Sequence, residues 1–556
     1  MLLSSTGGNG GEGVIIEQST DARTGWKEGR LELSVNVDRE ADLRHKCADL
    51  FGGGRLVIAS NRGPLEYEEM ADGQGLTYRI GSGGLVAALL ASARLADVTW
   101  VATAMTEADR HVAASGGPAP KDGRAVGCQV RFVAPDRRAY HLHYNVFSNP
   151  ILWFLHHSML DGLRRRDLWD QMEKAWGKGY VPVNRAFADA VVEELRRPGS
   201  AGVALLQDYH LYLAGRYVRD RAPDAVLQHF VHVPWPEPHA WLDIPWYITQ
   251  AICDGLLAND VVRFQTRKFA RNFLLTCLDH VRGAFVDFEK AVVSYEGRRT
   301  RVRSGAISVD PRYLQGKAAS AEAQGYLKKL GPLAGEHTIV RVDRVDPSKN
   351  VLGGFQAFDL LLRRHPELRG RVKFLAFLVP SRTGIPEYRR YAEQVFRLID
   401  CINARYGDKS WRPIEVFYEN NFEQALAGMT LYDVLLVNSL ADGMNLVAKE
   451  GPVVNQCDGV LVLSTRAGAF QELGEGALAV NPQDLNGTAE ALWQALGMPA
   501  SERRRRASLL RAAITERPLL TWMSEQLEEL HEVAVGGAAE PALVGVGASF
   551  AREAVA

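Results

Sequence analysis

The stretch that decides the fold is YDVLLVNSLADGMNLVAKE, residues Tyr432–Glu450. Its apolar run, Asp433–Ser439, is rich in Val and Leu, which is typical of a strand buried on both faces of a parallel sheet. A small polar loop, Leu440–Asn445, follows, and then a pattern that predicts a helix. In an open α/β sheet, ligands bind beyond the carboxyl ends of the strands, where a helix start directs unpaired N–H groups at an anion. Asp442 and Glu450 therefore suit a sugar nucleotide, although this stretch taken alone slightly favours an ordinary strand-loop-helix unit in which Asp442 caps the helix.

Length and composition describe an ordinary globular protein. The chain has 556 residues, which favours two domains plus tails. It is 46% hydrophobic and 24% charged with a net charge of −1, so neither nucleic acid nor an acidic membrane is an expected partner. The six cysteines are scattered without a C-x-x-C pair, which favours a reducing compartment and argues against structural zinc. With no apolar run near about 18 residues and no N-terminal signal, we expect a cytoplasmic protein.

Strands and helices alternate along most of the chain, which predicts an α/β protein with two doubly wound domains. We expect an N-terminal extension over 1–54 that is partly disordered, a first domain over 55–310, a second over 311–500, C-terminal helices over 501–535 that cross back to the first domain, and a disordered tail over 536–556.

Polar residues follow the predicted strands of the first half. Arg62 comes just after the strand Arg55–Ser60, and Gly84 precedes an apolar helix pattern, either as a simple turn or where backbone approaches a diphosphate. Asp208 and His232 end two consecutive strands. Strand ends in one sheet share a crevice, so these two side chains suit recognition of sugar hydroxyls.

In the second half of the chain, Arg and Lys side chains follow the predicted strands. Arg344 and Lys349 lie between the strand Thr338–Val342 and the next helix, and Arg382 follows the strand Val372–Val379. Two cations beside a helix start suit a diphosphate, since charge-assisted hydrogen bonds contribute about 1.5–3 kcal/mol each. The alternative is an exposed basic loop.

Four histidines raise the question of a metal. The alternation in YHLHYN predicts a strand that places His141 and His143 on one face, with His156 and His157 nearby. No acidic or Cys partner stands at a familiar spacing, so packed or surface histidines are favoured and no metal ligand is predicted.

Taken together, several short strings resemble the trehalose-6-phosphate synthase family. They occur in the family's order between about Arg55 and Val533. The strings are SNR (Ser60–Arg62), SGGL (Ser82–Leu85), YNVFSN (Tyr144–Asn149) with the later Trp153, DYH (Asp208–His210), HVPWP (His232–Pro236), DRVDPSK (Asp343–Lys349), PSR (Pro380–Arg382) and DGMNLVAKE (Asp442–Glu450).

The resemblance implies a GT-B fold, with two Rossmann-like domains facing across a cleft. It also implies a retaining transfer of glucose from a nucleotide-glucose (UDP- or GDP-glucose) to glucose 6-phosphate, giving trehalose 6-phosphate. Both substrates are small molecules, no cofactor is required, and a homo-oligomer is compatible with it. The implied donor-binding set is Gly84, Arg344, Lys349, Asp442, Gly443, Met444, Asn445, Leu446, Val447 and Glu450; the acceptor-binding set is Arg62, Tyr144, Trp153, Asp208 and Arg382; and the catalytic set is Asp208, His232, Arg344 and Lys349.

The implied set can act without a metal. Arg344, Lys349 and a helix start would stabilise the negative charge of the departing diphosphate, and the chain has no D-x-D motif for a metal-bound diphosphate. Retention follows if the acceptor hydroxyl attacks from the leaving group's face, so no protein nucleophile is assigned.

Three departures from the family pattern leave alternatives open. Gln207 replaces the usual His, Asn350 replaces the usual Gly, and Gly451–Pro452 is expected to shorten or kink the helix. A related transferase with another acceptor, of the glucosylglycerol-phosphate or validoxylamine 7′-phosphate type, remains possible, as does a non-catalytic sugar-phosphate sensor. A phosphorylase would need a pyridoxal-phosphate lysine that we cannot identify. The sequence does not indicate which nucleotide base the donor carries, because loop backbone that recognises a base leaves no motif.

Overall fold

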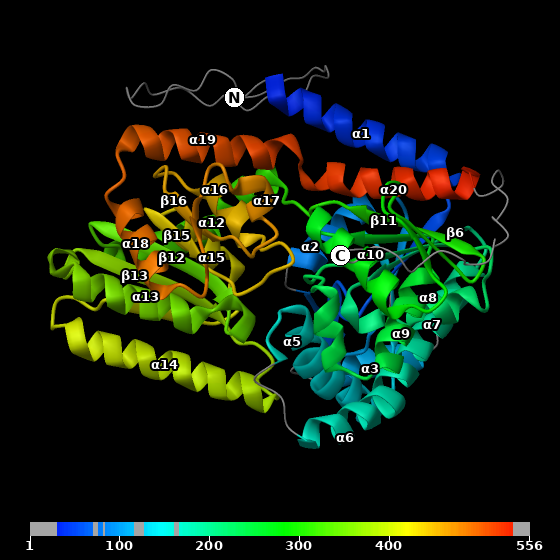
Figure 1. The fold of residues 1–556 in the computed structure, drawn as a ribbon. Coiled ribbons are helices and arrows are strands. Elements are labelled where there is room, and N and C mark those ends of the chain that lie inside the picture. Colours follow the sequence, from blue (N-terminus) through cyan, green and yellow to red (C-terminus); the bar gives the residue numbers. More distant parts are fainter. Residues whose placement is uncertain (1–30, 71–75, 82–83, 116–126, 161–165, 537–556) are drawn as a thin grey trace, which may run out of the picture.

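The computed structural model describes residues 31–70, 76–81, 84–115, 127–160 and 166–536. Two α/β domains lie side by side, each built on a mostly parallel sheet (Figure 1). The predicted tail over 536–556 and the first 30 residues lie outside the described part of the chain, apart from Gly536. None of the described helices is long and apolar enough to cross a membrane.

The first sheet has nine strands in the order β5-β4-β1-β6-β7-β8-β11-β10-β9. Its central strands are buried along their length and are parallel, while β9, β10 and β11 form an antiparallel edge. Because β1, β6 and β7 are neighbours, the residues that follow them meet at one edge of the sheet. The strands are β1 (Arg55–Ser60), β4 (Val98–Thr103), β5 (Gln129–Val133), β6 (Ser200–Gln207), β7 (Val226–Val231), β8 (Val261–Phe264), β9 (Phe285–Asp287), β10 (Val292–Tyr295) and β11 (Arg298–Ser304); β2 (Leu65–Glu69) and β3 (Leu76–Ile80) form a separate hairpin.

The second sheet has six parallel strands in the order β14-β13-β12-β15-β16-β17. The chain builds outward from β12 to β14 and then returns to add β15 on the other side of β12. This reversal of strand order is the position at which open α/β sheets bind ligands. The strands are β12 (His337–Arg344), β13 (Val372–Val379), β14 (Ile414–Tyr418), β15 (Val434–Val437), β16 (Val460–Ser464) and β17 (Leu478–Val480).

Helices cover both sheets, as the alternating pattern predicts. Those of the first domain are α2 (Gly84–Leu90), α3 (Glu107–Ala114), α4 (Arg137–His141), α5 (Trp153–His156), α6 (Arg166–Ala175), α7 (Val181–Leu195), α8 (Ala214–Arg219), α9 (Trp246–Leu257) and α10 (Arg267–His280). Those of the second are α11 (Pro311–Ala318), α12 (Ala321–Leu330), α13 (Val351–Arg364), α14 (Pro386–Tyr406), α15 (Phe422–Met429), α16 (Val447–Val454), α17 (Phe470–Leu473), α18 (Leu485–Leu496) and α19 (Ala500–Glu516).

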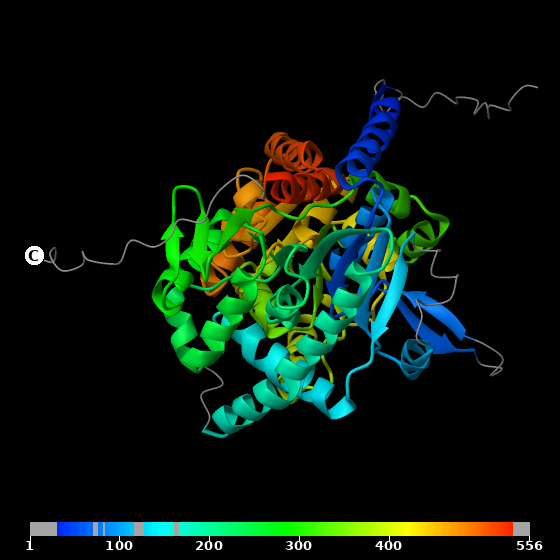
Figure 2. The ribbon, with the colours of Figure 1, turned by 90° about the vertical axis from the view of Figure 1, so that its right-hand side faces the viewer.

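Two further helices pack on the first domain. In α20 (Leu519–Gly536), Gln526 accepts a hydrogen bond of 2.8 Å from Gln228 of β7, so the end of the described chain lies on the first sheet. The N-terminal α1 (Leu31–Phe51) projects from the body of the molecule (Figure 2), and near its end it joins α20 through Lys46 and Glu528 at 2.8 Å. The weak pattern of the N-terminal extension gave no sign of α1. The domain boundaries themselves stay a prediction.

The strand predicted from YHLHYN is wrong. Asp136 caps α4 by accepting from the N–H groups of Arg138 and Ala139 at 2.9 Å, and a π-helical segment, Leu142–Leu152, continues from it. A few alternating residues are a weak strand signal, and here the cap and the packing of this segment on its neighbours prevail.

Candidate active site

The residues predicted for the site come from both domains and meet where the carboxyl edges of the two sheets face each other. Trp153 of α5 donates to Asp346 of the second domain at 3.2 Å. Arg382, which follows β13, donates to Tyr209 of the first domain at 3.1 Å. Direct bonds therefore join the two domains at this edge.

Lys349 and Asp442 form an ion pair at the reversal point between β12 and β15. The side chain of Asp442 also accepts from Ser439 at 3.2 Å and from Asn445 at 3.1 Å. Burial raises the pKa of Asp442, but the Lys349 ammonium outweighs burial and holds the pKa below its ordinary value. Lys349 is only 13% exposed, so this cation faces the site rather than bulk water.

The loop after Asp442 presents the start of α16. Asn445 has a left-handed backbone (φ 74°), and its side chain accepts from the N–H of Ala448 at 3.3 Å. The loop after β16 fixes this turn, because Ala469 donates to the carbonyl of Met444 at 2.9 Å. Leu446 and Val447 stand at the first positions of the helix, where backbone N–H groups lack intrahelical partners.

Two glycines allow the domains to approach each other closely. A Cβ atom on Gly443 would overlap the backbone carbonyl of His232, and one on Gly84 would overlap the side chain of Leu446. Each pair joins the first domain to the loop over residues 442–446. The predicted residues Gly84, His232, Gly443 and Leu446 are thus brought together.

We expect Gly443→Ala to lower kcat/KM by about 10²-fold, because the methyl group would keep the domains from closing fully and reacting groups misplaced by about 1 Å cost that much. The matched control is Gly316→Ala, since Gly316 has open space around it. Steady-state kinetics and a thermal melt test this. An unchanged kcat/KM would show that the close approach is not needed for turnover.

Arg382 lies at the centre of the predicted acceptor set. Its guanidinium donates to Asp346 at 2.8 Å and to Tyr388 at 2.7 Å, and it stacks over the ring of Trp153 at 4.1 Å from the centroid. Its backbone is left-handed (φ 47°), a strained state that concentrates at functional sites. Its Nε is buried and has no hydrogen-bond partner among the described residues.

Positive charge surrounds Tyr144. Burial raises the pKa of this phenol, but the guanidinium groups of Arg382 and Arg62 outweigh burial, and the pKa lies below its ordinary value. Arg62 also hydrogen-bonds to the Tyr144 hydroxyl. Arg344 stands 5.3 Å from the Trp153 ring. The predicted residues Arg62, Tyr144, Trp153 and Arg382 therefore form one group.

Asp208 and His232 are adjacent, as their strand-end positions predict. The backbone N–H of His232 donates to the Asp208 carboxylate at 3.2 Å. Burial raises the pKa of Asp208 to about 6. The backbone of Asp208 is left-handed (φ 68°), which no sequence signal indicated.

Both ring nitrogens of His232 form hydrogen bonds to glutamine side chains. Gln265 accepts from the N–H of Ile307 at 2.9 Å through its oxygen, so its Nε2 donates to His232 Nδ1 at 3.0 Å. His232 Nε2 then donates to the Gln207 oxygen at 2.9 Å. Burial lowers the pKa of His232 to about 3, which keeps the ring neutral. A sugar hydroxyl would have to displace a glutamine to reach the ring, whereas the His232 carbonyl lies against Gly443.

Glu450 differs from the other predicted residues in its bonding. Within the described part of the chain its carboxylate has no hydrogen-bond or ion-pair partner, and burial raises its pKa to about 7. An unpaired, half-buried carboxylate one turn into α16 is available to a ligand hydroxyl.

The departures noted in the sequence have structural explanations. Asn350 adopts the left-handed backbone (φ 55°, ψ 40°) that a Gly would adopt at no cost, and its side chain donates to the carbonyls of Asn438 at 3.2 Å and Pro482 at 2.9 Å. Gly451 packs α16 onto Leu435, where a Cβ would overlap. With Pro452 inside it, α16 is short, as expected.

The four histidines are packed or on the surface, as predicted: His143, His156 and His157 are buried, and His141 is exposed. His156 donates from Nδ1 to the carbonyl of Pro234 at 2.7 Å and accepts from Tyr212 at 2.9 Å. His157 stacks on Trp153 at 4.1 Å. Across the described ranges no group of three or more His, Cys, Asp or Glu could hold a metal ion.

Several residues that orient the predicted side chains have no recognisable signal in the sequence. Asp346, Tyr209 and Tyr388 orient Arg382. Lys449 of α16 donates to the carbonyl of Ile307 between the domains at 2.9 Å. Asp346 and Lys449 lie inside quoted motifs, but a single carboxylate or ammonium in a motif does not reveal its partner.

Comparison with known proteins identifies similar chains. Residues 54–532 match the model of glycosyltransferase family 20. A bifunctional trehalose-6-phosphate synthase/phosphatase of Thermoproteus tenax is 33% identical over 495 residues, 86% of this chain and 63% of that protein. The chain thus spans less than two thirds of this relative.

Two solved structures have the same fold. An alpha,alpha-trehalose-phosphate synthase (UDP-forming) from Burkholderia xenovorans, in complex with glucose-6-phosphate, has a TM-score of 0.73 and 29% identity, covering 86% of this chain and 100% of its own. An E. coli protein bound with UDP-2-fluoro glucose also has a TM-score of 0.73, with 26% identity over 86% of this chain and 99% of its own.

Proposed function

Because the chain belongs to glycosyltransferase family 20 and has the GT-B fold, we propose that it transfers glucose from a nucleotide-glucose to glucose 6-phosphate, releasing a nucleoside diphosphate and forming trehalose 6-phosphate. One observation carries the proposal. The Lys349–Asp442 pair lies by the start of α16, and the cluster of Arg62, Arg382 and Trp153 lies where the two domains meet. The first set suits a diphosphate-sugar and the second suits a phosphate, which supports a transfer between the two.

The donor would lie along the loop between Asp442 and Glu450. Asp442 and the backbone of residues 443–445 would hold the sugar hydroxyls, and the first N–H groups of α16 would meet the diphosphate. Glu450 would accept hydrogen bonds from the ribose. Lys349 and Arg344 would neutralise the charge that develops on the leaving oxygen. Each of these groups belongs to the second domain.

The acceptor would enter from the first domain. Arg62 and Arg382 would hold its phosphate, and Asp208 would accept a hydrogen bond from its sugar. Attack of the acceptor hydroxyl on the face that the diphosphate leaves would retain the anomeric configuration without a protein nucleophile. The departing diphosphate oxygen would then be the nearest base for the hydroxyl proton.

The names of two relatives favour UDP-glucose as donor, since one is UDP-forming and the other was solved with a UDP-sugar. An alternative is the same transfer to a different phosphorylated acceptor. A non-catalytic sensor is disfavoured, because the Lys349–Asp442 pair and the free carboxylate of Glu450 retain the donor-site chemistry.

A substrate panel tests the proposal. Purified protein is incubated with UDP-, GDP- and ADP-glucose, each with glucose 6-phosphate, glycerol 3-phosphate or unphosphorylated glucose, and products are identified by mass and anomeric configuration. We expect an α,α-linked phosphorylated disaccharide from UDP-glucose and glucose 6-phosphate. Turnover only with another acceptor would contradict the acceptor assignment, and binding without nucleoside diphosphate release would favour a sensor.

Donor binding should strengthen as pH rises. The pKa of Glu450 is raised to about 7, so its carboxylate form predominates only above that pH. Because the ribose hydroxyls need the carboxylate as acceptor, donor affinity should increase about tenfold between about pH 6 and about pH 8, in step with the ionised fraction. Calorimetric titration with UDP-glucose measures this.

Glu450→Gln should weaken binding and remove the pH dependence, since the amide does not ionise. Glu516→Gln, at the end of α19, is the control and should keep the wild-type profile. Affinity that falls with rising pH would mean that protonated Glu450 donates to the ligand instead.

A further inference from the structure

Asp346 is a buried carboxylate between β12 and the turn that carries Lys349. Its side chain is fully inaccessible to solvent. Its Oδ1 accepts from the N–H of Ser348 at 3.0 Å and from the Ser348 hydroxyl at 2.9 Å, which fixes the carboxylate on its own backbone. The carboxylate therefore has one orientation, set by the second domain.

The same carboxylate bonds to groups from both domains. Oδ1 accepts from the indole N–H of Trp153 at 3.2 Å, and Oδ2 accepts from Arg382 at 2.8 Å, with Arg344 at 3.8 Å. Trp153 belongs to the first domain and the two arginines to the second. Its indole ring also stacks on His157 at 4.1 Å and against the Arg382 guanidinium. Asp346 is thus a joint between two elements that meet only when the domains are together.

The charge and geometry of Arg382 depend on this joint. Burial raises the pKa of Asp346, but Arg382 and Arg344 outweigh burial and hold the pKa below its ordinary value, so the carboxylate is ionised. Arg382 donates to Asp346, Tyr388 and Tyr209, which together fix the guanidinium plane. The Nε–H is left without a partner in the described part of the protein. A fixed, partly unsatisfied guanidinium is prepared for an anionic oxygen.

We propose that Asp346 is a positioning residue that completes the acceptor-phosphate site only on domain closure, by holding Arg382 and Trp153 in one arrangement. The proposal rests on the proposed function for the identity of the acceptor. Asp346 touches neither substrate; it acts through Arg382 and Trp153. Binding of a sugar phosphate then becomes coupled to closure of the cleft.

Asp346→Asn tests the role, because it keeps the shape but removes the charge and replaces one carboxylate oxygen with an NH₂ group, which cannot accept a hydrogen bond from the partner that it faces. We expect the KM for glucose 6-phosphate to rise roughly 10- to 100-fold, as expected for loss of a charge-assisted hydrogen bond, with the donor KM changed by less than about twofold. With unphosphorylated glucose as acceptor, the variant and wild type should differ by less than about threefold.

The matched control is Asp359→Asn. Asp359 of α13 also pairs with two arginines, Arg363 and Arg405, but within the second domain. It should leave both KM values unchanged. A double variant with Trp153→Phe, which removes only the indole N–H, should cost less than the sum of the single changes.

Hydrogen–deuterium exchange separates this inference from the assigned activity. If Asp346 joins the domains, Asp346→Asn should lose protection in peptides covering residues 149–157 and 380–388 whichever acceptor the enzyme uses, and Asp359→Asn should not. Unchanged protection in both peptides, or equal rises in donor and acceptor KM, would overturn the inference. Loss of protection in a protein that ignores glucose 6-phosphate would keep the joint and refute the proposed acceptor.

Discussion

Lys349→Ala is expected to lower kcat by about 10³-fold, since removing one preorganised group that faces developing charge typically costs 10²–10³-fold and Lys349 carries a full charge in a site with little exposure. The effect should fall on kcat more than on the donor KM, because negative charge accumulates on the diphosphate as the glycosidic bond breaks. Single-turnover kinetics with UDP-glucose and excess acceptor measure the chemical step directly.

The variant should remain folded. Asp442 loses its cation but keeps hydrogen bonds from Ser439 and Asn445, and without Lys349 its pKa will rise. Circular dichroism and a thermal melt check this point. Lys328→Ala, on the exposed end of α12, is the control and should match wild type. A kcat within a few-fold of wild type would remove Lys349 from the leaving-group site.

The ends of the predicted strands indicated which residues of the candidate site would lie close together. Long apolar runs such as β13 and β15 are reliable signals, and the carboxyl ends of parallel strands must share an edge, so Lys349 and Asp442 could be expected to meet. Their pairing follows from β12 and β15 being neighbours, which the sequence order does not reveal, since β13 and β14 intervene.

Other features depend on tertiary context and left no local signal. The left-handed backbones of Asp208 and Arg382 are held by surrounding structure and not by a glycine. The π-helical segment Leu142–Leu152 replaced a predicted strand because a few alternating residues do not outweigh the cap and the packing around it. Asp346 is a single carboxylate whose partners lie 36 and 193 residues away, so no spacing rule could identify it.

Hydrogen bonds also connect α16 to the segment between the two domains. Lys449, next to Glu450 on α16, donates to the carbonyl of Ile307 and pairs with Glu472 at 2.6 Å. The N–H of Ile307 donates in turn to Gln265, which holds His232. Ile307, between the two domains, is therefore bonded through its carbonyl to Lys449 of α16 and through its N–H to Gln265 of the first domain.

Arg382→Ala is expected to lower kcat/KM for glucose 6-phosphate by about 10³-fold, because it removes a phosphate ligand and its charge-assisted hydrogen bonds. It should also lower the free energy of unfolding by about 3–5 kcal/mol, because Asp346 is left as a buried, poorly compensated charge. Arg62→Ala should raise the acceptor KM by a smaller factor, roughly 10- to 100-fold, since Arg62 is exposed and loses only its own bonds to the phosphate.

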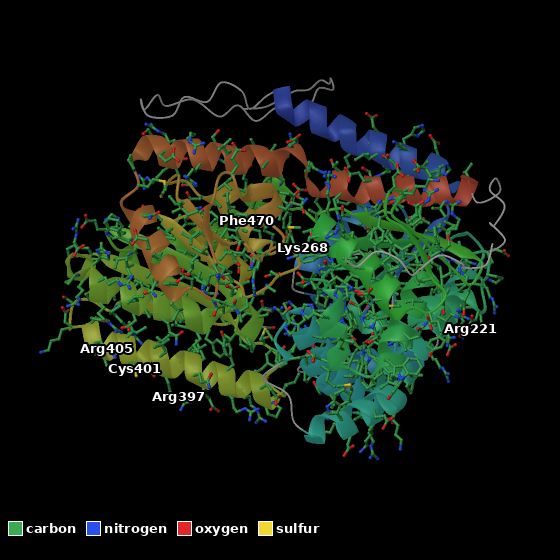
Figure 3. The ribbon with its side chains drawn as sticks, in the orientation of Figure 1. Arg221, Lys268, Arg397, Cys401, Arg405 and Phe470 are labelled. Atoms are coloured by element: carbon green, nitrogen blue, oxygen red, sulfur yellow. The ribbon has the colours of Figure 1, made fainter. Side chains whose placement is uncertain are left out.

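The phosphate itself distinguishes this role from a structural one. With unphosphorylated glucose the Arg62→Ala defect should disappear, whereas Arg382→Ala should keep the part that arises from the orphaned Asp346. Adding Asp346→Asn to Arg382→Ala should then recover part of the lost stability but none of the acceptor affinity. Arg397→Ala, on the outer face of α14 (Figure 3), is the matched control and should behave as wild type. If Arg62→Ala and Arg382→Ala both left the acceptor KM and kcat unchanged, the phosphate would bind elsewhere, and the charge around Tyr144 would need another ligand.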